Sequence, residues 1–281
     1  MKAVILAGGK GSRISEESRF KPKPLVEIGG RPILWHIMKL YSFYGVNEFI
    51  ICCGYKGHLI KEYFVNYNNT NRVSSYELGN MEYRGLHNAN TEDDENMSEQ
   101  LQTAQRSSGF SEEKFKVTLV DTGLETLTAG RLQQVRQYLE GEEEFFLTYG
   151  DGVSDVDLDE LLKFHHEHGK CVTITTYPKE ERFGRLKLSE NQTEVESFHE
   201  KSKAEASLIN AGFMVMNQGV FDYLGDGSEM LENGPFEKLS GAGEMAAYMH
   251  KGFWSPMDTL KEQMYLDNLC RANRAPWMVW K

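Results

Sequence analysis

Three glycines and one arginine follow the first apolar run of the chain within a few residues. Segment 6–13 reads Leu-Ala-Gly-Gly-Lys-Gly-Ser-Arg. Glycines allow the backbone to approach a bulky anion, and their amides can donate to phosphate oxygens. The guanidinium of Arg13 adds a fixed charge and a planar fork of donors. We therefore interpret the segment as a nucleotide-binding loop, with a purely structural turn as the alternative. Its residues are Leu6, Ala7, Gly8, Gly9, Lys10, Gly11, Ser12 and Arg13.

The spacing of these glycines separates the loop from two familiar phosphate-binding motifs. A dinucleotide fingerprint G-x-G-x-x-G that starts at Gly9 would need a glycine where the chain has Ile14. A P-loop needs four residues between its first glycine and Gly-Lys-Ser/Thr, and the chain has no such segment. The loop therefore matches neither motif.

A basic, proline-rich segment follows the glycine loop after a short interval. It reads Lys21-Pro22-Lys23-Pro24, and its prolines hold the chain extended and remove backbone donors. Side chains of such a segment alternate in direction, so one lysine can point inward and the other outward. Taken alone, the segment is a solvated basic loop. Beside the glycine loop, we expect Lys23 to neutralise phosphate charge.

Two carboxylates have the chemistry of a magnesium site. Asp151 lies between Gly150 and Gly152 at the end of an apolar run, where ligands of open α/β sheets bind. Asp258 lies far along the chain, in a segment rich in aromatic residues and proline. Proteins usually hold Mg²⁺ with one or two carboxylates, substrate phosphates and waters. The alternative for Asp151 is an ordinary turn, which favours Asp and Gly.

The elements that must position these residues alternate along the chain. Apolar runs at 2–7, 49–53, 117–120, 145–149 and 171–176 predict strands, and apolar residues with helical spacing predict helices at 33–41, 58–67, 129–139, 158–167 and 259–272. The last hundred residues are less regular, with strand-like runs at 185–188, 195–198 and 211–216. This order favours an α/β fold, with a Rossmann-like, mixed and mostly parallel sheet flanked by helices. We expect a single domain over residues 1–281 with an embellished C-terminal part.

An acidic segment over residues 85–113 interrupts the alternation. It has seven acidic residues and one basic residue, so its net charge of −6 is over half of the −11 of the whole chain. Because the segment has few apolar residues, we expect a mobile surface insert.

Composition limits the class of protein. Of the 281 residues, 40% are hydrophobic and 26% are charged, as in ordinary globular domains. The acidic excess would repel a phosphate backbone, so we expect no nucleic-acid partner. Because no apolar run reaches the length of a membrane span, we also expect no membrane partner. Four cysteines without C-x-x-C spacing favour buried thiols in a cytoplasmic protein.

The glycine loop and the Lys-Pro-Lys-Pro segment together resemble the sugar-phosphate nucleotidyltransferase family. Further likeness lies at 26–30, 33–38, 51–57, 117–123, 148–152 and 252–259, and so covers nearly the whole chain outside the acidic insert. The resemblance implies transfer of a cytidylyl group from CTP to α-D-glucose 1-phosphate, giving CDP-glucose and pyrophosphate. The sugar phosphate would attack the α-phosphorus in line, with Mg²⁺ as cofactor. It also implies the fold type of the nucleotide-diphospho-sugar transferases.

The same resemblance assigns roles to individual residues. The catalytic residues would be Arg13, Lys23 and Asp151, and the Mg²⁺ ligands would be Asp151 and Asp258. Nucleotide contacts would come from the glycine loop, Lys23, Thr128, Arg131 and Gly150. Sugar-phosphate contacts would come from Tyr149, Glu200, Lys201, Asn210 and Gly212. The chain departs from the family's pattern at Lys10, Ala129, Ser202 and Ala211.

The departures at Ala129, Ser202 and Ala211 bear on the exact sugar more than on the activity. Two other functions stay open beside the leading one. One alternative is a nucleotidyltransferase for another base or sugar 1-phosphate, and another is a non-catalytic protein that binds nucleotide sugars. The apolar C-terminal segment 276–280 must also be covered, either by a second subunit or by its own domain. The resemblance implies a homo-oligomer.

Overall fold

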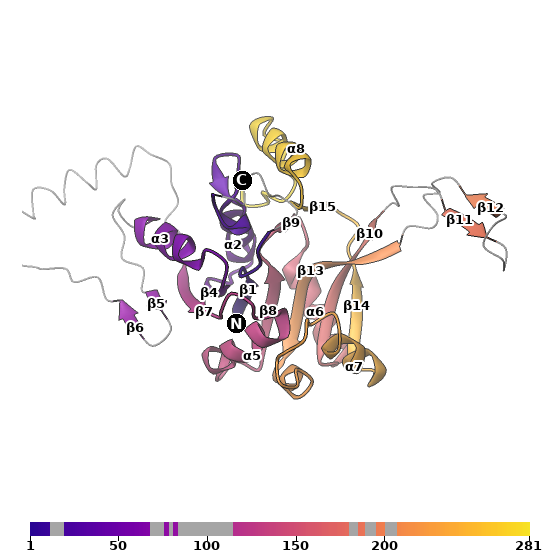
Figure 1. Ribbon diagram of the computed structural model, residues 1–281, viewed down its shortest axis with the longest axis horizontal. Helices are drawn as coiled ribbons and strands as arrows, with labels where there is room; N and C mark the ends of the chain where they lie inside the picture. Colours follow the sequence, from indigo (N-terminus) through magenta and orange to yellow (C-terminus); the bar gives the residue numbers. More distant parts are fainter. Residues whose placement is uncertain are drawn as a thin grey trace, which may run out of the picture.

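The protein is described by a computed structural model over residues 1–11, 20–67, 76–78, 81–83, 115–179, 185–188, 195–199 and 207–281. In this part of the chain a nine-stranded sheet runs through the molecule (Figure 1). Its strand order is β14-β10-β13-β8-β1-β4-β7-β5-β6. The strands are β1 (Lys2–Leu6), β4 (Glu48–Cys53), β5 (Tyr76–Leu78), β6 (Met81–Tyr83), β7 (Lys116–Asp121), β8 (Glu144–Tyr149), β10 (Val172–Lys179), β13 (Ser207–Asn217) and β14 (Met245–Met249).

The sheet is mixed but mostly parallel, as the sequence predicts. β8, β1, β4, β7 and β5 are parallel neighbours. β13 runs antiparallel to both β8 and β10, β14 is parallel to β10, and β6 is antiparallel to β5. From β1 the chain proceeds to β4 and β7 on one side, and β8 lies on the other side. The strand order therefore reverses beside β1, which is where open α/β sheets bind ligands.

Helices cover both faces of the sheet, because alternate residues of each buried strand point to opposite sides. Ile5, Phe49 and Phe146 face one core, while Val4, Ile50 and Leu147 face the other. The first core is covered by α2 (Ile33–Phe43), α3 (Gly57–Tyr67), α6 (Leu158–His168) and α8 (Leu260–Arg271). The second is covered by α5 (Thr128–Val135), the 3₁₀ turn η5 (Gln218–Asp222) and α7 (Pro235–Gly241).

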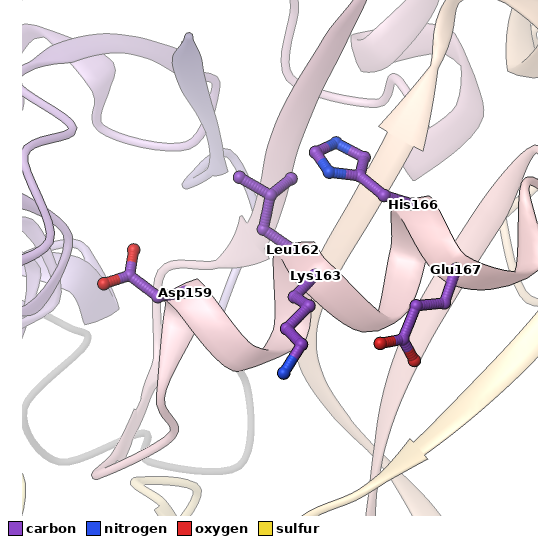
Figure 2. A pocket seen from close by; sticks show the side chains of 5 residues that line it. All are labelled: Asp159, Leu162, Lys163, His166 and Glu167. Carbon is purple, nitrogen blue, oxygen red and sulfur yellow. The ribbon is translucent and has the colours of Figure 1, made fainter.

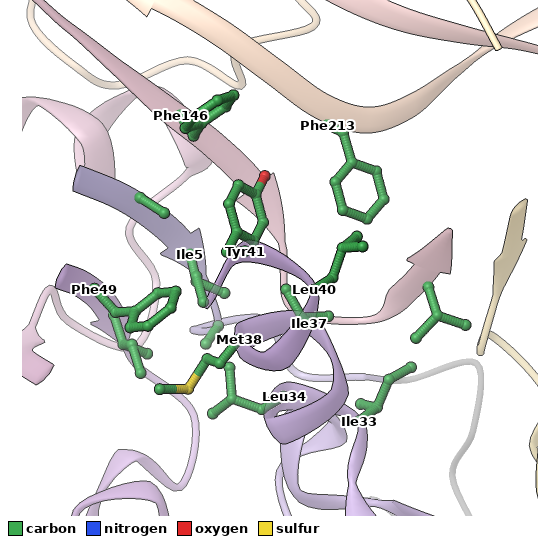
Figure 3. Packing of buried hydrophobic residues seen from close by; sticks show 14 of the residues in the cluster. Ile5, Ile33, Leu34, Ile37, Met38, Leu40, Tyr41, Phe49, Phe146 and Phe213 are labelled. Carbon is green, nitrogen blue, oxygen red and sulfur yellow. The ribbon is translucent and has the colours of Figure 1, made fainter. Parts of the chain in front are cut away.

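Helix α2 lies at the centre of the first core. Figure 3 shows its apolar side chains, among them Ile37 and Tyr41, packed toward β1, β4, β8 and β13. The rings of Tyr41 and Phe146 meet edge to face, with centroids 5.4 Å apart. Such burial of apolar area is the main source of stability in a domain. It holds the carboxyl ends of β1 and β8 in a fixed relation.

Short elements complete the described chain. They are the 3₁₀ turns η2 (Lys23–Leu25) and η3 (Arg136–Leu139) and the two-stranded pairs β2 (Glu27–Ile28) with β3 (Arg31–Pro32), β9 (Gly152–Ser154) with β15 (Trp254–Pro256), and β11 (Arg185–Leu188) with β12 (Val195–His199). The helix predicted at 129–139 is α5 followed by η3. The sequence did not predict α7, β14 or the β9–β15 pair. No helix in these described ranges is long and apolar enough to cross a membrane.

The C-terminal segment packs on its own chain. The sequence left open whether a second subunit or the segment's own domain would bury it. Trp277 is 1% exposed, and its ring stacks on that of Phe253. Its indole Nε1 donates to His36 Nδ1 at 3.2 Å. The ring of Trp280 lies 6.0 Å from that of Trp35 on α2. Trp277 therefore needs no second subunit for its burial. The acidic segment 85–113 lies outside the described residues.

Candidate active site

A cleft of about 300 Å³ opens at the point where the strand order reverses. It lies at the carboxyl ends of β1 and β8, which are neighbours in the sheet. Its lining combines the glycine loop with residues from distant segments: Leu6, Ala7, Gly8, Gly9, Gly11, Lys23, Pro24, Thr126, Leu127, Thr128, Arg131, Tyr149, Gly150, Asp151 and Met230. The fold thus gathers most of the sequence-predicted nucleotide and catalytic residues around one space.

A second hollow, of about 410 Å³, lies along α6. Figure 2 shows its lining side chains, which all come from this one helix: Asp159, Leu162, Lys163, His166 and Glu167. His166 is engaged with Glu144 at 2.9 Å, and Lys163 with Glu160 at 3.7 Å. Because the described residues that line it all come from α6, this hollow is not a candidate for the chemistry.

Close packing at the glycine loop explains why glycine is needed there. A Cβ on Gly8 would lie 2.2 Å from Nη1 of Arg131, and one on Gly54 would lie 2.6 Å from the same atom. The Gly8 carbonyl accepts from Arg131 Nη2 and from the Tyr55 amide, both at 3.1 Å. Gly11 has φ of +61°, a left-handed conformation that favours glycine.

Arg131 holds this loop against the neighbouring strand ends. It is 4% exposed, and its guanidinium donates to the carbonyls of Cys53 and Gly123 and to the hydroxyl of Thr122 at 2.6–3.1 Å. Burial lowers the pKa of Arg131 from its ordinary value. The side chain lines the cleft, but its recorded hydrogen bonds within the described chain all go to protein acceptors. Arg131 therefore stabilises the loop through these hydrogen bonds. Its contact with a nucleotide remains a prediction.

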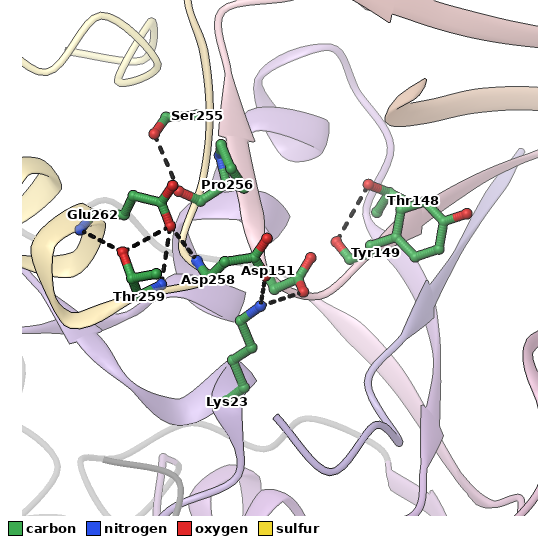
Figure 4. A network of polar contacts seen from close by, with 9 residues as sticks. All are labelled: Lys23, Thr148, Tyr149, Asp151, Ser255, Pro256, Asp258, Thr259 and Glu262. Carbon is green, nitrogen blue, oxygen red and sulfur yellow. Dashed lines mark hydrogen bonds and ion pairs between the residues drawn. The ribbon is translucent and has the colours of Figure 1, made fainter. Parts of the chain in front are cut away.

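Lys23 points inward and Lys21 outward, as the proline-rich segment predicts. Lys23 begins η2, is 7% exposed, and places its ammonium 2.7 Å from Asp151 Oδ2 and 2.6 Å from Asp258 Oδ1 (Figure 4). Lys21 is exposed and pairs with Glu27 at 2.7 Å. Two carboxylates from distant parts of the chain therefore converge on one buried cation.

Backbone pairing brings the two carboxylates together. Asp151 lies between β8 and β9, and β9 pairs antiparallel with β15, with Gly152 opposite Pro256. The Met257 amide donates to the Asp151 carbonyl at 2.8 Å. The residue after Met257 is Asp258, so this ladder sets its position.

A helix cap then fixes Asp258 at the start of α8. Glu262 Oε2 accepts from the amides of Asp258 and Thr259 at 2.8 and 2.9 Å, and the Thr259 hydroxyl accepts from the Glu262 amide (Figure 4). This is a capping box, and Thr-x-x-Glu is its sequence pattern. Glu262 was not among the residues predicted from the sequence, although the Thr-x-x-Glu pattern indicates it.

The donor set of Asp151 and Asp258 fits a divalent cation. Their oxygens already surround a positive charge, and carboxylates are the ligands that Mg²⁺ prefers. The described residues contain no group of three or more His, Cys, Asp or Glu that could hold a metal ion. The other ligands of Mg²⁺ would therefore be phosphate oxygens and waters, which is how proteins usually hold it beside a nucleotide.

A second polar network begins at Tyr149, which lines the cleft. Tyr149 donates its hydroxyl proton to Glu232, and Asn210 Nδ2 lies 3.4 Å from the same hydroxyl. Asn210 Oδ1 accepts from the Gly212 amide at 2.8 Å. Gly212 has φ of +93°, and a Cβ there would lie 2.8 Å from the Tyr149 ring. The fold thus joins Tyr149, Asn210 and Gly212, three of the predicted sugar-phosphate residues.

Lys10, Asn210, Gly212 and Asp258 are described by the structure but do not line the cleft. Ser12, Arg13, Glu200 and Lys201 lie outside the described residues. Lys10 is exposed and pairs with Glu125 at 2.7 Å. Sequence reasoning in turn missed Glu232 and Met230, because residues 223–234 have no hydrophobic period that would indicate an element.

Comparisons with known proteins agree on similarity to nucleotidyltransferases. A model of the nucleotidyl transferase family matches residues 2–262. The chain is 45% identical over 282 residues to a glucose-1-phosphate cytidylyltransferase of Salmonella typhi, and all of both chains is covered. It is 42% identical over 281 residues, again with full coverage of both, to a probable glucose-1-phosphate cytidylyltransferase of Bacillus subtilis.

Solved structures share the fold at lower identity. HddC from Yersinia pseudotuberculosis has a TM-score of 0.64 and 20% identity, with 97% of this chain and 99% of that chain covered. A UDP-glucose pyrophosphorylase complexed with UDP-glucose has a TM-score of 0.61 and 15% identity, with the same coverage. These likenesses show that the chain shares the overall fold of the two structures.

Proposed function

The chain belongs to the nucleotidyl transferase family, and we propose that it transfers a cytidylyl group from CTP to α-D-glucose 1-phosphate, giving CDP-glucose and pyrophosphate. The full-length identity of 45% to a glucose-1-phosphate cytidylyltransferase supports the base and the sugar. The observation that carries the chemistry is the position of Lys23, Asp151 and Asp258 beside the glycine loop.

This arrangement suits in-line attack of a sugar phosphate oxygen on the α-phosphorus of a nucleotide. The reaction joins two anions, so it needs alignment and charge neutralisation rather than a protein nucleophile. Glycine-loop amides would hold the triphosphate, while Lys23 and Arg13 would offset charge that grows as pyrophosphate leaves. Removing one such donor commonly costs ~10²–10³ in rate.

Asp151 and Asp258 would hold Mg²⁺ in the working enzyme. When bound, the ion supplies positive charge at the phosphate oxygens and helps to align the reacting groups. Lys23 already lies between the two carboxylates, so its ammonium must share that space with the incoming metal or turn toward a phosphate. The long, flexible lysine stem allows that movement.

The sugar end would be formed by Tyr149, Asn210 and Gly212, together with Glu200 and Lys201. The Asn210 amide suits sugar hydroxyls, since it offers both a donor and an acceptor. Nucleotide contacts of Thr128, Arg131 and Gly150 belong to the same proposal, and all three residues line the cleft.

Pyrophosphate release tests the whole proposal. Glucose 1-phosphate and Mg²⁺ are mixed with CTP, UTP, dTTP, ATP or GTP, and release is expected with CTP. Release with another nucleotide alone would keep the fold and the metal chemistry but overturn the choice of base. The assay is then repeated with other hexose 1-phosphates. If no combination releases pyrophosphate while CTP still binds in calorimetry, the chain is a nucleotide-binding protein rather than a transferase.

We also propose a cytoplasmic, homo-oligomeric enzyme without nucleic-acid or membrane partners. All four cysteines are free thiols, which suits a reducing compartment. The acidic excess disfavours nucleic acid. Sedimentation velocity at low micromolar concentration tests the assembly, and a purely monomeric species would contradict it.

A further inference from the structure

We propose that Glu232 is a positioning residue for the sugar end of the cleft, and that it holds the hydroxyl of Tyr149 as the hydrogen-bond acceptor for the Asn210 amide. Glu232 lies between η5 and α7, in a segment without regular structure. The inference rests on the proposed function, since it concerns how the same cleft selects its sugar phosphate.

The backbone amide of Gly212 can only donate a hydrogen bond. It donates to Asn210 Oδ1 at 2.8 Å, so the oxygen of this side chain must face Gly212. The amide nitrogen of Asn210 then faces the other way. It lies 3.4 Å from the Tyr149 hydroxyl, and an amide nitrogen can only donate.

The hydroxyl of Tyr149 is therefore the acceptor toward Asn210, and its single proton must go elsewhere. That proton goes to Glu232, whose carboxylate is acceptor-only when ionised. The donor and acceptor directions of the network are thus determined at every step from Gly212 to Glu232.

Glu232 is itself held from the nucleotide side of the cleft. Its Oε2 accepts from the Thr128 hydroxyl at 3.3 Å, and the Thr128 oxygen accepts from the Leu231 amide at 2.7 Å. Thr128 lines the cleft and begins α5. The carboxylate therefore joins the start of α5, which flanks the proposed nucleotide site, to the Tyr149–Asn210 pair.

This network determines which sugar hydroxyls the Asn210 side chain can bind. The Asn210 nitrogen faces Tyr149 and its oxygen faces Gly212. One amide hydrogen and one oxygen lone pair of Asn210 then remain for a ligand. Loss of Glu232 lets the Tyr149 hydroxyl turn its proton toward the Asn210 amide nitrogen, which is also a donor, so the side chain of Asn210 is no longer held in place. Sites that bind substrate hydroxyls through hydrogen bonds discriminate strongly between substrates, because a substrate without the matching hydroxyl leaves buried polar groups unpaired.

The first test compares Glu232→Ala with Glu229→Ala. Glu229 lies in the same segment, but its side chain is exposed and pairs with Lys238. For Glu232→Ala we expect the KM for glucose 1-phosphate to rise about 10-fold, the value of one lost hydrogen bond, while kcat and the KM for CTP change less than about 3-fold. Preference for glucose 1-phosphate over galactose 1-phosphate should also fall. Glu229→Ala should behave as the wild type. A loss confined to kcat would overturn the inference.

A double-mutant cycle separates positioning from general disruption. Tyr149→Phe removes the hydroxyl through which Glu232 acts, so adding Glu232→Ala should change the sugar KM less than about 2-fold further. Fully additive effects would contradict the relay. Glu232→Gln keeps an acceptor oxygen for Tyr149 and should stay close to the wild type. If it is folded and as damaging as Glu232→Ala, the charge matters rather than the hydrogen-bond direction.

Reversed polarity gives a readout that does not depend on Glu232→Ala folding. Asn210→Asp places acceptors on both sides of one phenolic proton, so we expect a lower melting temperature. Adding Glu232→Gln supplies a donor to the Tyr149 oxygen and should recover part of that loss. No recovery would overturn the inference. Wild-type turnover is measured in parallel, so failure of the proposed reaction is seen separately.

Discussion

The ammonium of Lys23 lies 2.7 Å from a carboxylate oxygen of Asp151, in the cleft where the nucleotide is proposed to bind. The same ammonium is 2.6 Å from Asp258, so one lysine balances two acids. Attraction at such distances is strong because the lysine is almost fully buried. The acids that would bind a metal are thus kept together by a residue proposed to act on phosphate.

Replacing Lys23 should separate these two roles. Lys23→Met removes the charge and keeps the length of the side chain, so we expect ~10²–10³-fold slower CDP-glucose formation. Because the carboxylates then lack their cation, Mn²⁺ should bind more tightly in the absence of nucleotide, as measured by calorimetry. Lys21→Met is the matched control, since that lysine is exposed and pairs only with Glu27 among the described residues. Unchanged Mn²⁺ affinity in Lys23→Met would contradict the balance of charges.

Asp151 should be needed for turnover but not for the fold. Asp151→Asn keeps the shape of the side chain and halves the negative charge of the proposed metal site, so we expect at least ~100-fold slower product formation. The melting temperature should fall only modestly, because Lys23 keeps Asp258 as its charged partner. Asp159→Asn, in the exposed first turn of α6, serves as the control. Near-normal activity of Asp151→Asn would remove this residue from the metal site.

The glycine loop offers a neighbouring pair with opposite expectations. A Cβ at Gly8 would lie 2.2 Å from Nη1 of Arg131, which is packed against backbone carbonyls. At Gly9 a Cβ would have no atom within 4 Å. We expect Gly8→Ala to lower the free energy of unfolding by about 1–3 kcal/mol and Gly9→Ala to change it by less than about 0.5 kcal/mol. Urea denaturation measures both, and equal effects would show that Arg131 moves freely.

Stability should fall in mild acid because of His36. Burial lowers the pKa of His36 to about 4 from the ordinary 6.5. Its Nδ1 accepts from Trp277, and its Nε2 faces the Ile28 carbonyl at 2.8 Å, so the folded ring has no place for a second proton. Between pH 6.5 and about 4 the unfolded chain takes up a proton that the folded chain does not, and unfolding is favoured as pH falls.

Denaturation at pH 7 and pH 5 tests this effect. His36→Gln should lose less stability between those values than the wild type, by up to about 2 kcal/mol. His58→Gln changes an exposed histidine and should keep the wild-type loss. Buried His165, whose pKa burial also lowers to about 4, contributes in the same direction in all three proteins. An identical loss in His36→Gln would contradict the role of His36.

Local patterns were enough to predict most elements, and together with the family resemblance they indicated the proposed catalytic residues. The apolar runs at 2–7 and 145–149 became β1 and β8, because strand burial depends on the side chains of the run itself. The glycine loop and Lys23 could be found for a similar reason, since phosphate binding needs particular residue types within a short segment. The alternation of strands and helices likewise predicted the mixed, mostly parallel sheet.

Tertiary structure alone decided which distant residues meet. The β9–β15 ladder brings Asp258 to Asp151, and the packing of the segment before α7 brings Glu232 to Tyr149. It also decided that Trp277 is buried by its own chain. These contacts join residues far apart in sequence, and their geometry depends on strand register and on the packing of two cores at once. The spacing of hydrophobic residues indicates the type of one helix or strand at a time. It therefore cannot specify which residues of two distant elements come into contact.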